Sequence, residues 1–229
     1  MQQVEASKEA ASSRPLPEGF VPSNCTYSEQ DWPVLARQWF PVCRADAALA
    51  KPRQVVVLNL RLVVYRLPDG IRVGRDMCPH RGLPLSGGRI EGEELVCAYH
   101  GLRFGSDGQC TKVPEKLAPK TADCFMVTMF PAVERHGLVW TCLIPDGEPA
   151  IPGISLAMES DGQGDPAPLF KLLPENSADA GQFDISVIKL NSDLENHQSL
   201  RNLALDEYQR LFDEIGSGSQ TNADRKSLS

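Results

Sequence analysis

Two short peptides, each with one cysteine and one histidine, constrain this chain more than any other feature. Cys78-Pro79-His80 has the pattern C-x-H, and Cys97-Ala98-Tyr99-His100 has the pattern C-x2-H, with sixteen residues between them. A glycine follows each peptide closely, and each peptide lies where a run of strand-forming residues gives way to a loop. We therefore expect two loops that face each other and together hold two irons.

The mixture of thiolate and imidazole ligands has a chemical consequence. A [2Fe-2S] cluster held by four thiolates has a very low potential, and replacing two thiolates on one iron by neutral histidines raises it. Two ferric ions, two sulfides and two thiolates carry no net charge, so reduction leaves a single negative charge to bury. The pattern predicts a centre for reversible one-electron transfer, ligated by Cys78, His80, Cys97 and His100.

Two other interpretations of these residues remain open at this stage. Structural zinc also accepts two cysteines and two histidines, but its usual pattern places both cysteines before both histidines. The residues could also be buried thiols and unrelated histidines. The chain has only four histidines, and two of them fall in this one pattern, which favours the cluster.

Composition restricts the class of protein and its partners. Hydrophobic residues make up 41% and charged residues 23% of the 229 residues, as in ordinary globular proteins. The net charge of −7 argues against nucleic acid or an anionic membrane as the partner. No apolar run reaches the roughly 18 residues of a membrane span, and the first thirty residues contain no secretory signal. We expect a cytoplasmic protein.

The cysteines as a whole do not suggest disulfides. There are seven, an odd number scattered along the chain, which favours metal ligation over a disulfide framework. Cys110, Cys124 and Cys142 fall within the strand pattern, and we expect them to be small buried hydrophobic residues.

Residues 30–148 carry the pattern of an antiparallel domain that is mainly β, a small sandwich or barrel. Short apolar runs such as QVVVLNL, RLVVYRL and GLVWTCLI are separated by turn residues such as Pro68-Asp69-Gly70. The flanking segments differ: we expect a flexible leader over 1–29, a Pro/Gly-rich arm over 149–190, a helix over 191–216 and a disordered tail over 217–229.

Two details of the C-terminal half refine this division. The arm is a linker or the remnant of a catalytic domain, and QFDISVIKL in it predicts a short strand. Ser192 and Glu195 have the spacing of a capping box, and one helical face repeats the apolar residues Ala204, Tyr208, Leu211, Phe212 and Ile215.

The segment RDMCPHRGLPLSGGRIEGEELVCAYHGLRFGSDGQCTKVP resembles the Rieske domain of the Rieske non-haem iron oxygenases, especially the vanillate demethylase, phthalate dioxygenase and caffeine demethylase branch. WPVLARQWFPVCRADAAL and ERHGLVWTCLIPDG extend the resemblance to about residues 30–150. It implies that Cys78 and Cys97 hold the inner iron and that His80 and His100 hold the outer one.

The neighbours of these ligands add to what the resemblance implies. Arg81 and Tyr99, beside the ligands, are expected to orient them. The cytochrome bc class has an additional cysteine in each loop and a serine after the last histidine. This chain has neither, since Gly101 follows His100. We therefore expect a potential near the low end of the Rieske range, roughly −150 mV.

The resemblance also raises the question of a second iron site. Such oxygenases bind a mononuclear iron through two histidines and a carboxylate in a catalytic domain. Apart from the cluster histidines, these 229 residues contain only His136 and His197, and the motif D-x2-H-x4-5-H is absent. We expect neither mononuclear Fe(II) nor catalytic residues in this chain, and we expect His197 to be a polar position on the C-terminal helix.

Three interpretations of what the chain does follow from these expectations. In the first, the chain accepts electrons from a reductase or ferredoxin and passes them to a partner's mononuclear iron, through a basic surface over 70–120 that suits an acidic donor. In the second, it is a truncated or atypical oxygenase subunit with its own demethylase, monooxygenase or dioxygenase activity. In the third, it is a decayed reading frame without function.

Overall fold

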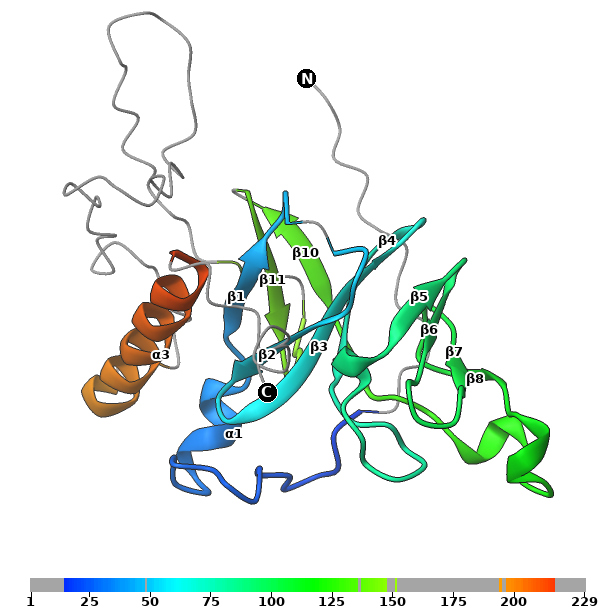
Figure 1. Ribbon diagram of the computed structural model, residues 1–229. Coiled ribbons are helices and arrows are strands. Elements are labelled where there is room, and N and C mark those ends of the chain that lie inside the picture. The colour runs from blue at the N-terminus through cyan, green and yellow to red at the C-terminus, as the bar shows by residue number, and fades with distance from the viewer. Residues whose placement is uncertain are drawn as a thin grey trace, which may run out of the picture. The chain divides into compact units, whose positions relative to one another are not determined.

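The structure is a computed structural model that describes residues 15–47, 49–135, 137–147, 151, 194 and 197–216 (Figure 1). This part of the chain consists mainly of antiparallel β sheets with a C-terminal helix, as predicted. It divides into two compact units. Of the described residues, the first unit holds 15–18, 49–54 and 61–131, and the second holds 19–47, 55–60 and those from 132 onward.

Two four-stranded antiparallel sheets build the first unit. One has the order β2-β3-β4-β9, and the other has the order β5-β6-β7-β8. The tip of the β2–β3 hairpin, residues 55–60, belongs to the second unit. The predicted turn at Pro68-Asp69 joins β3 to β4, with Leu67 opposite Gly70. The strands are β2 (Arg53–Val57), β3 (Leu60–Leu67), β4 (Gly70–Arg75), β5 (Arg89–Glu91), β6 (Glu94–Val96), β7 (Arg103–Phe104), β8 (Cys110–Lys112) and β9 (Met129–Phe130).

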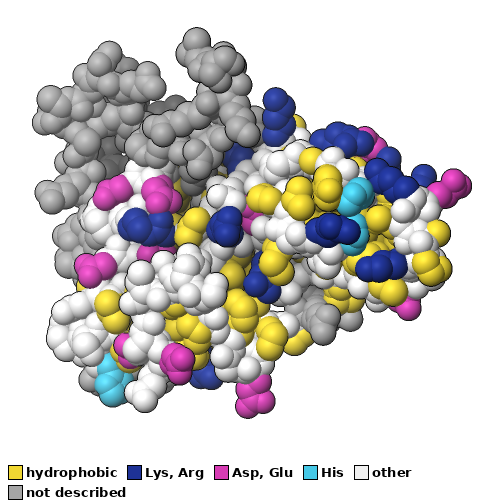
Figure 2. Space-filling view, turned by 60° about the horizontal axis from the view of Figure 1, so that its bottom comes forward, with side chains coloured by type: hydrophobic (Ala, Val, Ile, Leu, Met, Phe, Trp, Pro, Cys, Tyr) yellow, Lys and Arg dark blue, Asp and Glu magenta, His cyan; other side chains and the backbone are white. Residues whose placement is uncertain are grey.

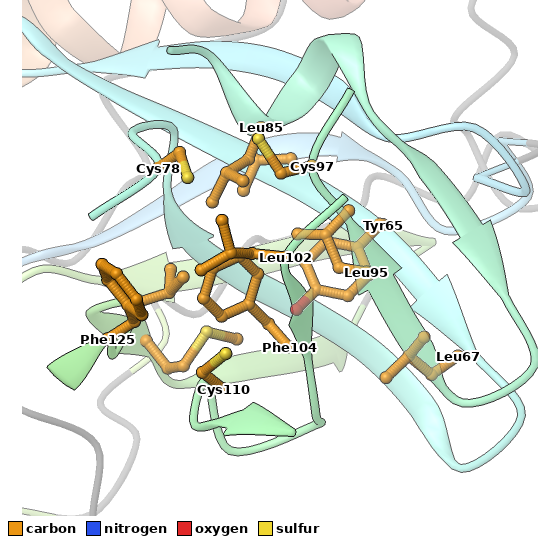
Figure 3. Close-up of a cluster of buried hydrophobic side chains, with 13 residues drawn as sticks. Tyr65, Leu67, Cys78, Leu85, Leu95, Cys97, Leu102, Phe104, Cys110 and Phe125 are labelled. Carbon is orange, nitrogen blue, oxygen red and sulfur yellow. The ribbon is translucent and has the colours of Figure 1, made fainter. Parts of the chain in front are cut away.

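The core of the first unit combines side chains from both sheets (Figure 3). Tyr65 of β3, Leu95 of β6 and Phe104 of β7 are almost completely buried in it. Burial of each such side chain contributes about 1.5–3 kcal/mol. Cys78, Cys97 and Leu85 lie at one end of this cluster in the close-up, and Cys110 lies at the other. The two cysteines of the motif are therefore anchored in the core.

The second unit contains a three-stranded antiparallel sheet of order β1-β11-β10. Its strands are β1 (Trp39–Arg44), β10 (Ala132–Arg135) and β11 (Leu138–Cys142), and two helices accompany them, α1 (Asp31–Leu35) and α3 (Gln198–Gly216). All five residues of β11 are buried, and the strand lies within the apolar run GLVWTCLI.

The apolar face of α3 packs within its own unit. The five residues of the predicted face are all buried. The Tyr208 hydroxyl donates a hydrogen bond of 2.5 Å to the carbonyl of Trp39, and its ring lies 4.9 Å from that of Phe40. Glu207 is buried as well, and it accepts hydrogen bonds from the backbone N–H of Leu58 at 2.8 Å and from Arg210. This face of the helix is therefore occupied by the chain itself.

The start of α3 differs from the prediction. The helix begins at Gln198, and the carbonyl of His197 accepts the first helical hydrogen bond, from the N–H of Arg201 at 2.9 Å. His197 thus precedes the helix instead of lying on it, because it occupies the capping position. Ser192 and Glu195 lie outside the described residues, as do the strand QFDISVIKL, nearly all of the arm, His136 and the tail over 217–229.

Part of the predicted leader makes specific contacts in the second unit. Thr26 donates hydrogen bonds to the side chain of Asn59 at 3.0 and 3.2 Å, and the Tyr27 hydroxyl donates to Glu207 at 3.2 Å. The ring of Phe20 lies edge-on to Trp32.

Neither of the described helices has both the length and the apolar character that crossing a membrane requires.

Candidate metal centre

The two predicted ligand loops have the same backbone turn. In the first loop, the N–H of Cys78 donates to the carbonyl of Leu83 at 2.7 Å and the N–H of Gly82 donates to the carbonyl of Cys78 at 2.7 Å. In the second, Cys97 bonds Leu102 at 2.9 Å, and Gly101 bonds Cys97 at 3.0 Å. Both loops share the sequence C-x3-G-L, a repeated signal that sequence reasoning missed.

Glycine is required at the corner of each turn. Gly82 has φ +74° and Gly101 has φ +80°, a left-handed conformation that other residues rarely adopt. The first loop follows β4 and the second joins β6 to β7. Each turn therefore directs one cysteine inward from the end of a strand.

The two thiols are buried, and each shifts the pKa of the other. Cys78 is 3% exposed and Cys97 is 2% exposed. Interaction between the two thiols raises the pKa of Cys78 and lowers the pKa of Cys97 to about 6; burial raises the pKa of Cys78 further. The backbone N–H groups of His80 and Arg81 lower the pKa of Cys78, and those of Tyr99 and His100 in the equivalent turn lower the pKa of Cys97. These donors stabilise negative charge on sulfur.

The two imidazoles meet at the surface beside the thiols. The Nδ1 atoms of His80 and His100 lie 3.1 Å apart, and the ring centroids lie 4.8 Å apart. Partial burial lowers the pKa of both histidines, and nearby positive charges lower it further: His100, Lys120 and Arg81 at His80, and Lys116 and Arg81 at His100. Both rings therefore favour the neutral form, which is the form that binds a metal.

The arrangement of the four donors fits a two-metal cluster. Two imidazole nitrogens, each about 2.1 Å from one metal ion, lie roughly 3 Å apart, close to the separation of the two Nδ1 atoms. Over the described residues, no three or more His, Cys, Asp or Glu side chains converge on a single point. The four donors form a pair of thiols and a pair of imidazoles, and a Rieske cluster would take one pair on each of its two irons.

Aromatic rings support the two histidines. Tyr99 is 52% exposed, and its ring centroid lies 3.8 Å from that of His100. The ring of Phe125, which sequence reasoning did not single out, meets His80 edge-on at 5.7 Å. Arg81 is exposed like Tyr99, but it acts on the histidines through its charge and not through a ring contact.

The surface around the histidines is apolar and basic. The three large hydrophobic side chains that are exposed in the described part of the chain, Met77, Leu83 and Tyr99, all lie in or beside the two loops. Figure 2 shows a part of the surface where histidine side chains lie among hydrophobic side chains and those of Lys and Arg. Exposed apolar residues rimmed by charge are typical of a protein interaction site.

The remaining cysteines of the β pattern behave differently from one another. Cys110 and Cys142 are buried, as predicted, and burial raises the pKa of Cys142 to about 12. The prediction was wrong for Cys124, which is exposed. It ends a short 3-10 helix, η3 (Ala122–Cys124), instead of lying in a strand, so its side chain does not reach the core.

Comparison with known proteins agrees with this geometry. Residues 38–131 match the family model of the Rieske [2Fe-2S] domain. The chain is 38% identical over 114 residues to the oxygenase component of dicamba O-demethylase from Stenotrophomonas maltophilia, which is 49% of this chain and 32% of that protein. It is 44% identical over 87 residues to a vanillate O-demethylase oxygenase subunit of Pseudomonas sp. (strain ATCC 19151), 37% of this chain and 25% of that protein.

A third relative has a different substrate in its name. Methylxanthine N1-demethylase NdmA of Pseudomonas putida is 36% identical over 108 residues, 44% of this chain and 31% of that protein. The chain thus spans about a third or less of the length of these relatives. The matched region contains both ligand loops and the core that anchors them. Residues 38–131 form a Rieske [2Fe-2S] domain, similar to those of demethylase oxygenase components, and the cofactor of this domain is a Rieske cluster.

Proposed function

We propose that Cys78, His80, Cys97 and His100 ligate one Rieske [2Fe-2S] cluster, with the cysteines on the inner iron and the histidines on the outer one. We further propose that the domain passes single electrons from a reductase or ferredoxin to the mononuclear iron of an oxygenase partner. The observation that carries the proposal is the pair of Nδ1 atoms 3.1 Å apart at the surface, beside two buried thiols.

The protein's own residues have distinct roles in this proposal. When bound, the cluster supplies reversible one-electron chemistry. Backbone N–H groups of the two equivalent turns hold the negative charge of the sulfurs, which burial alone would disfavour. The half-buried histidines form the boundary with solvent, so electrons enter and leave on their side.

The surface around the histidines indicates what kind of partner docks there. Arg81, Lys116 and Lys120 are exposed, and each acts on the pKa of a cluster histidine. Together with Met77, Leu83 and Tyr99 they give an apolar patch with a positive rim. Such a surface complements an acidic redox protein, since charge complementarity speeds encounter and an apolar centre holds the complex.

Stopped-flow reduction of the cluster tests this proposal. The donor is a chemically reduced, acidic plant-type ferredoxin, and cluster absorbance is followed in low and high salt. K116E/K120E is expected to slow the reaction roughly tenfold in low salt and to weaken its salt dependence.

The matched control is K112E. Lys112 is exposed, and its charge acts on Glu94 and on neither cluster histidine. Equal rates for K116E/K120E and K112E would contradict docking at the histidine surface.

A further inference from the structure

A buried carboxylate lies beside the first ligand loop. Asp76 directly follows β4, two residues before Cys78, and is only 5% exposed. Its carboxylate accepts three hydrogen bonds: from the N–H of Ser86 at 2.7 Å, from the Ser86 hydroxyl at 2.7 Å and from the Gln54 amide at 2.6 Å. Without such partners a buried carboxylate is strongly destabilising, so these bonds define its position.

The contacts of Asp76 close the loop that carries the first ligand pair. Ser86 lies in a short 3-10 helix, η1 (Leu85–Gly87), which follows His80 in the sequence. Both carboxylate oxygens bond this one residue, so the chain from 77 to 85 is closed at its base. The N–H of Asp76 also donates to the carbonyl of Arg61 at 3.0 Å, which ties the base of the loop to β3.

The same base also contacts the segment that leads to the second ligand pair. A Cβ atom on Gly88 would lie 2.3 Å from the carbonyl oxygen of Val96, so the chain just after Ser86 passes directly against the residue before Cys97. Leu85 is fully buried in the core cluster that contains both cysteines (Figure 3). Fixing Ser86 therefore fixes one ligand loop against the other.

We propose that Asp76 is a positioning residue for the cluster. Its carboxylate holds the base of the loop so that Cys78 and His80 face Cys97 and His100. This inference rests on the ligand assignment of the proposed function. An alternative is that Asp76 acts only as a negative charge near the cluster, which would change the potential and leave loop closure unaffected.

Two variants separate positioning from charge. S86A keeps the carboxylate and removes one of its hydrogen bonds, and D76N removes the charge and replaces one acceptor oxygen with a donor. The control is D69N, which removes a carboxylate from the β3–β4 turn, where Asp69 pairs with Arg72. Asp69 bonds neither ligand loop.

The measurement is the rate of cluster loss to an iron chelator, followed anaerobically by visible absorbance of the full holoprotein. S86A is expected to lose the cluster roughly tenfold faster than the unmodified chain, D76N at least as fast as S86A, and D69N at the unmodified rate. Amide hydrogen exchange of residues 77–85 in the cluster-free chain is expected to rise in D76N and S86A.

Retention and exchange in S86A equal to those of the unmodified chain would overturn the inference. So would a D76N protein that differs from D69N only in potential. If the unmodified chain binds no cluster, the proposed function fails, and the exchange measurement still decides whether Asp76 closes the loop.

Discussion

His80 and His100 occupy different places in equivalent turns. His80 is the second residue after its cysteine, and His100 is the third after its own. Their Nδ1 atoms nevertheless lie 3.1 Å apart, because the two loops face each other. The two loops have equivalent backbone turns and face each other. A histidine two residues after one cysteine and a histidine three residues after the other therefore reach the same point.

The lowered pKa of both histidines predicts how the cluster-free chain responds to acid. Between the ordinary value of 6.5 and the lower value in the folded chain, the unfolded chain binds more protons than the folded one. The contribution of the two histidines to the free energy of unfolding is therefore fully present above pH 6.5 and is lost as the pH drops through the folded pKa. The melting temperature of the cluster-free chain, measured from pH 7.5 to pH 5, is expected to decrease.

The double variant H80Q/H100Q tests the origin of this pH dependence. In H80Q/H100Q the melting temperature is expected to decrease less between pH 7.5 and pH 5. In H197Q, which changes the histidine before α3, the decrease is expected to match that of the unmodified chain. The same slope in H80Q/H100Q and in the unmodified chain would assign the effect to other groups.

At the scale of elements, two adjacent glycines have different roles. An added Cβ on Gly88 would meet the carbonyl of Val96 at 2.3 Å, whereas one on Gly87 meets nothing within 4 Å. G88A is expected to destabilise the first unit by about 1–3 kcal/mol, because the chain must move away from β6.

G87A is the matched control for this change, with the same added methyl group one residue earlier. Urea unfolding of the cluster-free proteins measures both effects. A G88A protein as stable as G87A would show that the close approach of Gly88 to β6 does not hold the loops together.

The attachment of α3 depends on one buried carboxylate. Glu207 accepts from the N–H of Leu58 and from Arg210, which is itself hydrogen-bonded to the carbonyl of Val56. E207Q is expected to lower the free energy of unfolding of the second unit by about 2–4 kcal/mol. Asp213, exposed on the same helix, gives the control D213N.

Thermal unfolding by circular dichroism measures the change, and cluster absorbance is recorded in parallel. Since the ligand loops belong to the first unit, E207Q is expected to retain its cluster. Equal unfolding of E207Q and D213N would contradict a structural role for Glu207.

Local sequence signals predicted much of this architecture. Apolar runs and the turn at Pro68-Asp69 predicted β3 and β4, and the apolar repeat predicted the buried face of α3. The motif predicted two facing loops that each carry one cysteine and one histidine, because loop glycines and ligand types are both visible in the sequence. Cys124 was misjudged, since strand-like composition does not reveal that the chain turns there into η3.

Contacts between distant residues could not be predicted in this way. Asp76 bonds Ser86 ten residues later and Gln54 twenty-two residues earlier, and neither partner carries a local signal. The contact of Phe125 with His80 is similar, because it depends on how a late segment packs against an early loop. Such contacts follow from tertiary packing, which a single sequence specifies only through the whole fold.

For the whole molecule, iron content separates electron transfer from oxygen activation. A carrier with one cluster contains two irons and two sulfides per chain, whereas an oxygenase subunit with its own mononuclear site binds a third iron. We expect two irons by elemental analysis of the purified chain, and no loss of iron in H197Q. A third iron that disappears in H197Q would instead favour an oxygenase subunit.

The central claim is that two cysteines and two histidines hold one [2Fe-2S] cluster. Electron paramagnetic resonance of the dithionite-reduced protein tests it directly, since histidine ligation of one iron changes the g values of the cluster. We expect a single [2Fe-2S] signal whose average g lies below that of four-thiolate clusters, and a shift toward the four-thiolate value in H80C. An average g equal to that of four-thiolate clusters in the unmodified chain would contradict ligation by His80 and His100.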